Sequence, residues 1–573
     1  LDANSTASYN SALGYNSLSA NTTGEENTAL GRIALQDNTT GSRNTAVGSG
    51  ALENNTTADN NTAVGRDSLQ QNTTGTENVA VGTYALDANT TASDNTAFGY
   101  ASLTANTTGG NNTAVGANSL RDTTTGGENT AVGYQALLSN TTGDDNVAIG
   151  VNALRDNTTS VGNIGIGRDA LLKNTTGNYN SAVGNVAFDA NTTGDHNCAF
   201  GQAALGSNTT ADNNTALGSN ALADNTTGYS NTAVGKAALI SNTTAADNTA
   251  LGNVAMQGNT EGFQNTALGS HALYTNTTGD NNVAVGYGAL YHQTTANNNT
   301  ACGRDCLNEN TTGTQNVAVG AYTLDQNTTA SNNTGVGYNC LGALSTGYNA
   351  VAIGAEALRD NTTSVGNTAV GEACLRGCTT GGTNTAVGNN AGLDVTTGSN
   401  NLLLGFNAGR STSPSGQITS GSDAVCLGNN DIGDIYCADT TISSSDKRDK
   451  TDITNFTHGL DWINQMQPVT YRWDRRSWYL DDADGDITSV TPDGSRKRQR
   501  INLGLLAQDV LEIETADGYS TDRDSQLIVN QTEDEKSYGI KYDRIVPVLI
   551  NAVKELSAKN TALEARIAAL ESA

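Results

Sequence analysis

The sequence is poor in aromatic residues, proline and long apolar runs. Aromatic residues make up 5% of the 573 residues, and there are four prolines and three tryptophans. Apolar residues amount to 36%, which is low for a globular chain of this length. This scarcity argues against several ordinary globular cores. No run of about 18 apolar residues exists, which excludes a membrane-spanning helix and membrane insertion.

Basic residues are also few: 29 Lys and Arg stand against 57 Asp and Glu, for a net charge of −28. Such a surface repels nucleic acid and anionic lipid, so we expect neither as a partner. No secretory signal is visible. The chain opens on Leu1, inside a repeat and without Met, so we expect a longer natural protein with an N-terminal anchor or targeting segment.

In place of these residues the sequence has a short repeat. The motif Asn-x-Ala-Val-Gly begins at Asn10, begins again at Asn27, and keeps this spacing, a period of 17, as far as Asn401. When each copy is numbered from this Asn, position 5 is always Gly, and position 9 is Leu, Phe or Met from Leu18 to Leu375. A disordered chain does not need an apolar residue at fixed spacing, so the repeat predicts a solenoid.

Each copy contains the parts of one coil. The Asn-Thr-Ala-Val-Gly segment predicts a short strand, a second short segment begins at Ala-Leu, and Asn-Thr-Thr-Gly predicts the returning turn. One copy is too small to fold alone. We therefore expect a parallel β-solenoid, or β-roll, with Asn ladders between coils and Gly at a tight corner. At about 4.8 Å per coil the shaft would extend roughly 115 Å.

The predicted strand carries apolar residues on both faces, at positions 3 and 4. We therefore expect it to be covered once by its own coil and once by another chain. The segments NVAIG (146–150) and NAVAIG (349–354) resemble the repeats of trimeric autotransporter adhesin heads. That resemblance implies a trimeric fibre, although the period here is longer than in those heads.

Other interpretations of the repeats remain open or are disfavoured. The Asn-Thr-Thr triplets match glycosylation sequons, but turn chemistry is the favoured explanation. No recurrent carboxylate pair suits glycoside hydrolysis, so a polysaccharide-degrading enzyme is a disfavoured third class. Ice-binding and calcium-binding repeats are disfavoured too. We expect no cofactor and no metal site.

Cysteines mostly follow the repeat phase and lack metal-ligand spacing. Cys306, Cys340 and Cys374 take position 8 and Cys302 takes position 4, so we expect small buried side chains there. Cys426 and Cys437 would form a disulfide if their region is a hairpin.

The composition changes near residues 410–445. Residues 445–573 hold 17 of the 29 basic residues and all three tryptophans. The segment 460–474 predicts an amphipathic segment, a Pro break and a strand, and 503–513 predicts a strand leading into a helix. Residues 542–572 predict a long helix.

Two sets of residues there carry a family resemblance. The first is Ser445, Asp446, Arg448 and Lys450. The second is Gly504, Ala507, Gln508 and Val510. With the flanking segments they resemble the C-terminal intramolecular chaperone of endosialidase-type phage tail fibres and spikes. The resemblance implies that the domain drives trimerisation and then cuts itself off between Ser444 and Ser445, with Ser445 as nucleophile and Lys450 as base. The alternative is a chaperone that stays attached.

The last helix supports a trimer independently, because apolar residues alternate by three and four along it. Asn560 occupies one core position, as a register device. The seam consists of Val546, Leu549, Val553, Leu556, Asn560, Leu563, Ile567 and Leu570.

Two segments between these blocks are ambiguous. The acidic segment 481–493 resembles half of a calcium loop but lacks the closing Glu, so an exposed hairpin is favoured. The basic run 496–500 is interpreted as the solvated partner of that acidic segment.

Together these features predict a mainly β, trimeric fibre. We expect a solenoid shaft over 1–409, a β-rich neck over 410–444, a small α+β chaperone domain over 445–541 and a trimeric coiled coil over 542–573. The expected function is that of a homotrimeric extracellular fibre, a phage tail fibre on the virion that binds a host-surface receptor, either a glycan or a protein. The alternative is a bacterial surface or secreted adhesin. Any enzymatic activity would be a single self-cleavage.

Overall fold

The computed structural model describes residues 3–432, 447–480, 487–520, 522, 525–532 and 536–572. The chain divides into two compact units, Leu1–Ser331 and Asn332–Ala573. Each unit is described by itself.

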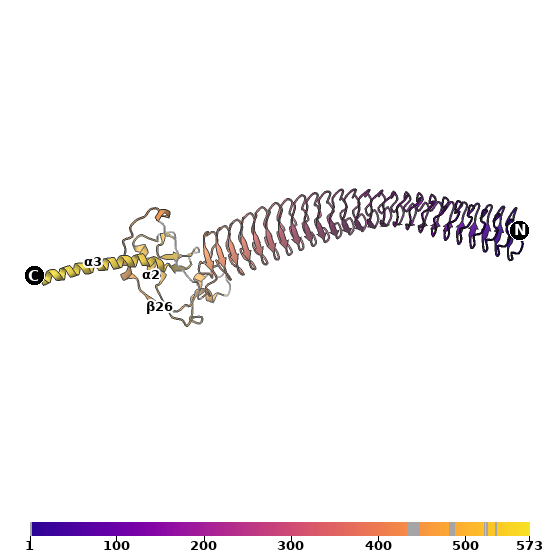
Figure 1. Cartoon of the computed structure of the whole chain (residues 1–573). Helices are drawn as coiled ribbons and strands as arrows, with labels where there is room; N and C mark the ends of the chain where they lie inside the picture. Colours follow the sequence, from indigo (N-terminus) through magenta and orange to yellow (C-terminus); the bar gives the residue numbers. More distant parts are fainter. Residues whose placement is uncertain are drawn as a thin grey trace. The chain divides into compact units, whose positions relative to one another are not determined.

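The first unit is a parallel β-solenoid with one three-residue strand per coil (Figure 1). Each strand pairs in parallel with the strand of the next coil, so that Ala46 lies opposite Ala63 and Ala63 opposite Ala80. The strands are β1 (Ser11–Leu13), β2 (Thr28–Leu30), β3 (Thr45–Val47), β4 (Thr62–Val64), β5 (Val79–Val81), β6 (Thr96–Phe98), β7 (Thr113–Val115), β8 (Thr130–Val132), β9 (Val147–Ile149), β10 (Ile164–Ile166), β11 (Ser181–Val183), β12 (Cys198–Phe200), β13 (Thr215–Leu217), β14 (Thr232–Val234), β15 (Thr249–Leu251), β16 (Thr266–Leu268), β17 (Val283–Val285), β18 (Thr300–Cys302) and β19 (Val317–Val319).

The interior is a thin column of small and medium side chains. Ala at position 3 and Leu at position 9 are fully buried, as at Ala63 and Leu69. Position 8 adds a second small buried residue, such as Ala51. The Ala-Leu segment forms turns rather than a second strand. Each coil therefore buries only a few small side chains against its neighbours, which confirms that single copies depend on stacking.

Two buried Asn columns connect the coils, as the repeat predicts. At position 12, Asn38 Nδ2 donates to Asn21 Oδ1 at 2.9 Å, and Asn55 Nδ2 donates to Asn38 Oδ1 at 2.8 Å. At position 1, the backbone N–H of Asn44 donates to Asn27 Oδ1 at 2.9 Å. These amides satisfy each other inside the coil, where an unpaired polar group would be costly.

Substitutions in the position 12 column show how the ladder depends on Asn. The Oδ1 atoms of Asn106 and Asn276 are buried without a hydrogen-bond partner. In each case the residue at the same position of the next coil is not Asn but Thr123 or Gln293. A ladder oxygen is thus orphaned where the next coil has no Asn to donate to it; the longer Gln293 instead donates to the Ala296 carbonyl at 3.0 Å.

Glycine at position 5 is required by close stacking. Gly65 has φ of +140°, and a Cβ added to it would lie 2.4 Å from the carbonyl oxygen of Gly82. Neighbouring corners therefore touch backbone to backbone, which confirms the predicted tight corner.

The outer face of the strands is partly exposed and uncharged in the single chain. Positions 2 and 4 point away from the interior, and Phe98 and Phe200 at position 4 are 55% and 40% exposed. No Asp, Glu, Lys or Arg occupies position 2 or 4 in any copy. The strand thus carries apolar residues on both sides, and its own coil covers one of them.

Cysteines at position 8 are small buried side chains, as expected. Cys306, Cys340 and Cys374 are fully buried, and burial raises the pKa of Cys306 and Cys374 to about 12. The expectation is wrong for Cys302, which is exposed because position 4 faces outward.

The second unit begins with the same architecture. Its solenoid strands are β20 (Thr334–Val336), β21 (Val351–Ile353), β22 (Thr368–Val370), β23 (Thr385–Val387), β24 (Leu402–Leu404) and β25 (Val425–Leu427). Leu402 pairs with Val425, so the coil that follows the last regular repeat is longer than the others. Cys426 sits at the inward position of β25 and is buried, while Cys437 lies outside the described residues.

The C-terminal part of the second unit is a small α+β domain ending in a long helix (Figure 1). β26 pairs antiparallel with β27, and β28 with β29. These elements confirm the strands and helices expected within 460–572. They are η1 (Lys447–Asp449), α1 (Leu460–Gln465), β26 (Val469–Tyr471), η2 (Arg476–Tyr479), η3 (Ile487–Ser489), β27 (Asn502–Gly504), α2 (Ala507–Ala516), β28 (Val529–Gln531), β29 (Tyr538–Ile540), η5 (Tyr542–Arg544) and α3 (Ile545–Glu571).

Candidate functional site

The C-terminal domain is organised around one small apolar core. Trp462 of α1 is its largest fully buried side chain. The core also contains Met466, Val510, Ile513, Ile528, Val529, Ile545 and Val548. Residues from α1, α2, β28 and the start of α3 therefore form one folding unit.

The beginning of α3 is fixed to this domain by polar contacts as well. Asn551 Nδ2 donates to the carbonyl oxygen of Phe456 at 2.8 Å, and the backbone N–H of Leu460 donates to Glu555 Oε2 at 3.2 Å. A Cβ on Gly459 would lie 2.7 Å from the backbone nitrogen of Ala552. Gly459 thus allows the close approach that seats α3 on α1.

The rest of α3 presents the predicted seam to the outside. All eight seam residues are exposed, among them Val553 at 66% and Leu556 at 51%. The buried face is a different one, made by Ile545, Val548 and Ala552. The helix therefore uses one face within its own domain and leaves the heptad face uncovered in the single chain.

The predicted cleavage residues are only partly within the described structure. Ser444, Ser445 and Asp446 lie outside the described residues. Arg448 belongs to η1, and the backbone N–H of Lys450 donates to the carbonyl oxygen of Lys447 at 3.4 Å. The Lys450 side chain is exposed, so its own domain does not bury it.

The second set of motif residues sits at the junction of β27 and α2. Gly504 is buried, and a Cβ on it would lie 2.5 Å from the hydroxyl oxygen of Tyr542. The same hydroxyl accepts a hydrogen bond from the backbone N–H of Leu505 at 2.9 Å. Val510 enters the core, while Gln508 is exposed. Gly504 and Val510 thus have clear structural roles.

Glu514 is a buried anchor that the sequence did not reveal. Its carboxylate accepts backbone N–H groups from Ile528 at 2.5 Å, and from Leu527 and Val529 at 3.2 Å each. Ser520 Oγ donates to it at 2.6 Å. This carboxylate ties α2 to the start of β28, where these donors compensate its burial.

A second unpredicted cluster joins α1 to the end of α2. His458 Nδ1 lies 2.8 Å from Asp461 Oδ2 and 3.5 Å from Asp517 Oδ2. Trp462 Nε1 donates to Asp517 Oδ2 at 2.5 Å. Burial pushes the pKa of Asp461 upward, but hydrogen bonds from His458 and the N–H of Gly459 outweigh it and lower the pKa.

These three side chains are close enough to share a metal ion, because their ligand atoms lie within 4.8 Å of one another. Their mutual contacts and the indole bond already explain the arrangement. The sequence could not reveal it, because His458 and Asp517 are far apart in the chain.

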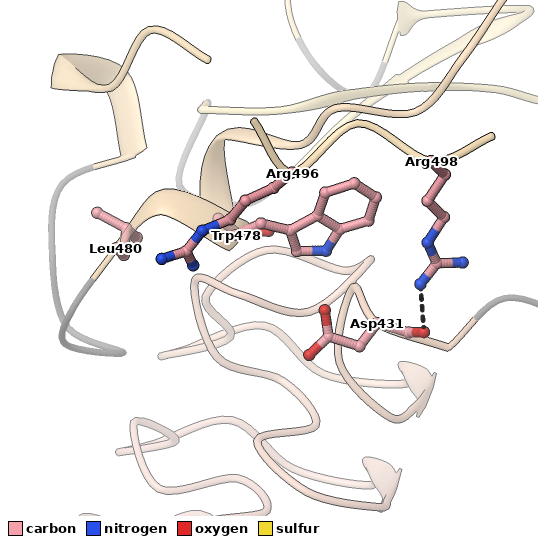
Figure 2. A pocket seen from close by; sticks show the side chains of 6 residues that line it. Asp431, Trp478, Leu480, Arg496 and Arg498 are labelled. Carbon is pink, nitrogen blue, oxygen red and sulfur yellow. Dashed lines mark hydrogen bonds between the residues drawn. The ribbon is translucent and has the colours of Figure 1, made fainter. Parts of the chain in front are cut away.

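The acidic and basic segments of the domain were expected to pair. Asp482, Asp484 and Asp486 of the acidic segment lie outside the described residues. In the basic run, Arg498 Nη2 donates to the carbonyl oxygen of Asp431 at 2.9 Å (Figure 2).

A group of arginines contacts the chain just after β25. Arg475 Nη1 donates to the Asn430 carbonyl at 2.5 Å and to Asn430 Oδ1 at 3.0 Å. Asn430 Nδ2 donates to Ser477 Oγ at 3.3 Å. Burial, followed by the nearby Arg498, lowers the pKa of Arg475. The chaperone-like domain thus contacts the chain after the last coil through backbone and side-chain groups, in addition to the covalent connection.

A pocket of about 410 Å³ lies beside these contacts and is lined by Asp431, Ser477, Trp478, Leu480, Arg496 and Arg498 (Figure 2). The Arg498 guanidinium lies 4.9 Å from the Trp478 ring centroid. The indole nitrogen of Trp478 is buried without a hydrogen-bond partner.

A scan against protein-family models places the domain. Residues 445–519 match the chaperone of endosialidase family (Peptidase_S74). This match begins at Ser445 and includes the α1 and α2 parts of the core, so it confirms the resemblance drawn from the motifs. No curated protein matches the chain.

No helix among the described residues has the length and apolar character needed to cross a bilayer.

Along the chain, the segment that matches the chaperone of endosialidase follows a parallel solenoid of regular coils. That combination fits a fibre of the phage tail fibre type.

Proposed function

We propose that the chain is one subunit of a homotrimeric extracellular fibre, a phage tail fibre that binds a receptor on the host surface. The observation that carries this proposal is the order of parts: an endosialidase chaperone segment at 445–519 follows a solenoid of in-register coils. A bacterial adhesin fibre with the same terminal domain is the alternative. A virion-docking domain N-terminal to Leu1 would favour the tail fibre, and a secretion signal would favour the adhesin.

The outer strand face supports the trimer. The chain has 57 acidic and 29 basic residues, yet none stands at positions 2 and 4 of any copy. A long face of this kind, rich in apolar side chains, is rarely left to solvent. Another copy of the chain carries the same uncharged columns at the same spacing, so it matches this face along the whole shaft.

The proposed role of the terminal domain follows from the repetition. Nearly identical coils can pair in many registers, because little distinguishes one from the next. A domain that associates first, through the exposed α3 seam, fixes one register. The arginine contacts at Asn430 and Asp431 would then transmit that register to the last coil.

The proposed cleavage separates these two parts between Ser444 and Ser445. The Ser445 hydroxyl attacks the carbonyl carbon of Ser444 while Lys450 takes its proton. Lys450 passes this proton to the peptide nitrogen, which leaves as the amino terminus of Ser445, and water hydrolyses the ester between Ser444 and the Ser445 hydroxyl. Residues 1–444, the shaft and neck, remain as the fibre. The reaction is a single turnover.

A lysine acts as a base at neutral pH only if its surroundings disfavour the charged form. Lys450 is exposed in the single chain. We therefore expect cleavage to follow assembly, with neighbouring subunits supplying the burial that Lys450 lacks alone.

Intact mass under denaturing conditions tests the cleavage. Wild type should yield a fragment of residues 1–444, and both Ser445→Ala and Lys450→Ala should remain full length. Lys447→Ala is the matched control and should still be cut. A wild-type chain that stays uncut in assembled fibres would contradict self-cleavage and leave only the folding role.

A further inference from the structure

One part of the shaft concentrates aromatic and polar side chains on a single surface. The four coils beginning at Asn265, Asn282, Asn299 and Asn316 stack in register through β16–β19. Residues at the same position therefore form columns along the shaft. Positions 6, 7, 10 and 11 of these coils form the surface described here as the ring-and-acid patch.

The first two coils contribute a cluster of rings. Tyr274 and Tyr291 are stacked, with ring centroids 4.9 Å apart. His271 lies 5.9 Å from Tyr291 and 5.7 Å from Tyr287, and His292 lies 4.6 Å from Tyr291. Tyr287 is 55% exposed, so one aromatic surface of the cluster remains accessible.

The next two coils continue the same columns with polar side chains. They line a pocket of about 480 Å³ whose walls include Asp305, Asn308, Glu309, Tyr322, Asp325 and Gln326. Asn308 and Asp325 continue the position 10 column of Tyr274 and Tyr291. Asp305 and Tyr322 continue the position 7 column of His271.

The two halves are in direct contact. His292 Nε2 lies 3.7 Å from Glu309 Oε1, and Asn308 Nδ2 donates to the Gly288 carbonyl at 3.0 Å. Gly288 makes room for the pocket, because a Cβ there would lie 2.5 Å from Asp305 Oδ1. The rings and the pocket are therefore one continuous surface.

Charge narrows the class of ligand. Three carboxylates surround the pocket, and its one neighbouring guanidinium is already engaged: Arg304 Nε lies 3.0 Å from Asp305 Oδ2 and packs 5.5 Å from the Tyr322 ring centroid. An anionic ligand would meet repulsion here. A ligand rich in hydroxyl groups instead finds carboxylate and amide acceptors beside aromatic surfaces for its C–H faces.

We propose that the ring-and-acid patch binds a neutral oligosaccharide. Sugar hydroxyls donate to Asp305 and Asp325 and exchange hydrogen bonds with the amide of Asn308, while C–H faces pack on Tyr287 and Tyr291. Four coils at about 4.8 Å spacing span roughly 14 Å between the first and the last, which favours a short oligosaccharide over a single sugar. This inference rests on the proposed receptor-binding function and names its ligand class.

The test is direct binding of the full chain to printed oligosaccharides. The panel contains neutral oligomers of glucose, galactose, mannose and N-acetylglucosamine, together with the same oligomers capped by sialic or glucuronic acid. We expect a neutral member to bind, and the double variant Tyr287→Ala/Tyr291→Ala or Asp325→Ala to lose about tenfold or more in affinity.

The matched control is Tyr134→Ala, which removes another tyrosine from the position 6 column. The exposed fraction of Tyr134 is 49%, similar to the 55% of Tyr287, but the residue at position 10 of its coil is Leu138. It should leave binding unchanged. The proposal is overturned if no neutral oligosaccharide binds, if acidic members bind in preference, or if the double variant binds like wild type.

These outcomes are separate from those of the proposed fibre function. Glycan binding needs neither cleavage nor a virion, so an uncut chain that binds neutral sugars would retain this inference and lose the cleavage. A trimer that is cut but binds no sugar would retain the proposed cleavage and contradict this inference.

Discussion

At the residue scale, the unexpected feature is the left-handed conformation of the apolar residue at position 9, which is Leu in most coils and Phe188 or Met256 in two. Leu52 and Leu69 have φ of +51° and +52° and are fully buried. This conformation costs roughly 1–2 kcal/mol for an L-residue, and burying a leucine contributes about 1.5–3 kcal/mol. Burial therefore offsets the strain, and a strained backbone can be repeated along the shaft.

The Asn ladder gives a residue-scale prediction. Asn225 Nδ2 donates to Asn208 Oδ1 and to the Gly228 carbonyl, each at 2.8 Å, and Asn225 Oδ1 accepts from Asn242 at 2.8 Å. Asn225→Ala leaves Asn208 Oδ1 buried without a partner, at about 1–3 kcal/mol. The Gly228 carbonyl and Asn242 Nδ2 each lose one hydrogen bond but keep another, from Asn214 and to Ala245. Hydrogen exchange should show faster opening around residues 208–245. The exposed neighbour variant Asp224→Ala should exchange like wild type, and equal protection in both would contradict the ladder.

Asp87 gives a pH-dependent prediction. Burial raises its pKa to about 6, with a smaller contribution from Asp67. The folded chain thus holds this proton where the unfolded chain has released it, so stability from this group falls as pH rises through roughly 4–6. At pH 7.5 Asp87→Asn should slow hydrogen exchange of residues 84–90 a few-fold. At pH 4 or below the gain should vanish. A gain that persists at pH 4 would rule out the charge as its cause.

The roles of residues that recur at one repeat position could be predicted from the sequence. Gly65 and its equivalents, the Asn columns and the buried Cys306 follow from repeat position alone. The left-handed leucines did not follow, because an apolar residue at position 9 gives no sign of its backbone conformation. Cys302 was mistaken for a buried residue because position 4 is apolar without being interior.

At the element scale, long-range pairing limited what the sequence could show. Strand β25 joins the solenoid after a longer coil, and the irregular step hides it from a search at the regular period. Glu514 and the His458 cluster depend on contacts between α1, α2 and β28, which no local motif announces. By contrast, α3 and α2 were predictable from apolar spacing.

The α3 seam gives an element-scale prediction about orientation. With Val546 at heptad position a, the two basic residues take position g on one flank of the seam and the two glutamates take position e on the other. The basic residues are Lys559 and Arg566, and the glutamates are Glu564 and Glu571. In a parallel bundle each basic residue faces the glutamate five positions further on in the neighbouring helix, at about 0.5 kcal/mol per pair. Lys559→Glu/Arg566→Glu should therefore lower the melting temperature of the assembly.

The compensating control is built into the same helix. Adding Glu564→Lys and Glu571→Lys to that double variant reverses every pair and should restore the melting temperature. Failure of the fourfold variant to recover would contradict a parallel, in-register bundle.

At the scale of the whole molecule, the repeated coils and the terminal domain have different roles. The coils build the solenoid from few residue types, with an interior of one Leu and one or two Ala in a typical coil. Such a shaft lacks any strong signal of register. The domain matched as a chaperone of endosialidase supplies an apolar core, a seam on α3 and contacts to the chain after the last coil. The ring-and-acid patch would add recognition without altering the shaft.

The central claim is that three chains associate through the exposed strand face and the α3 seam. The most direct measurement is the mass of the full-length Ser445→Ala chain in solution, by light scattering coupled to size exclusion. One chain is 58.8 kDa, so we expect a particle of about 176 kDa, three times that mass. A stable particle of one chain at micromolar concentration would contradict it.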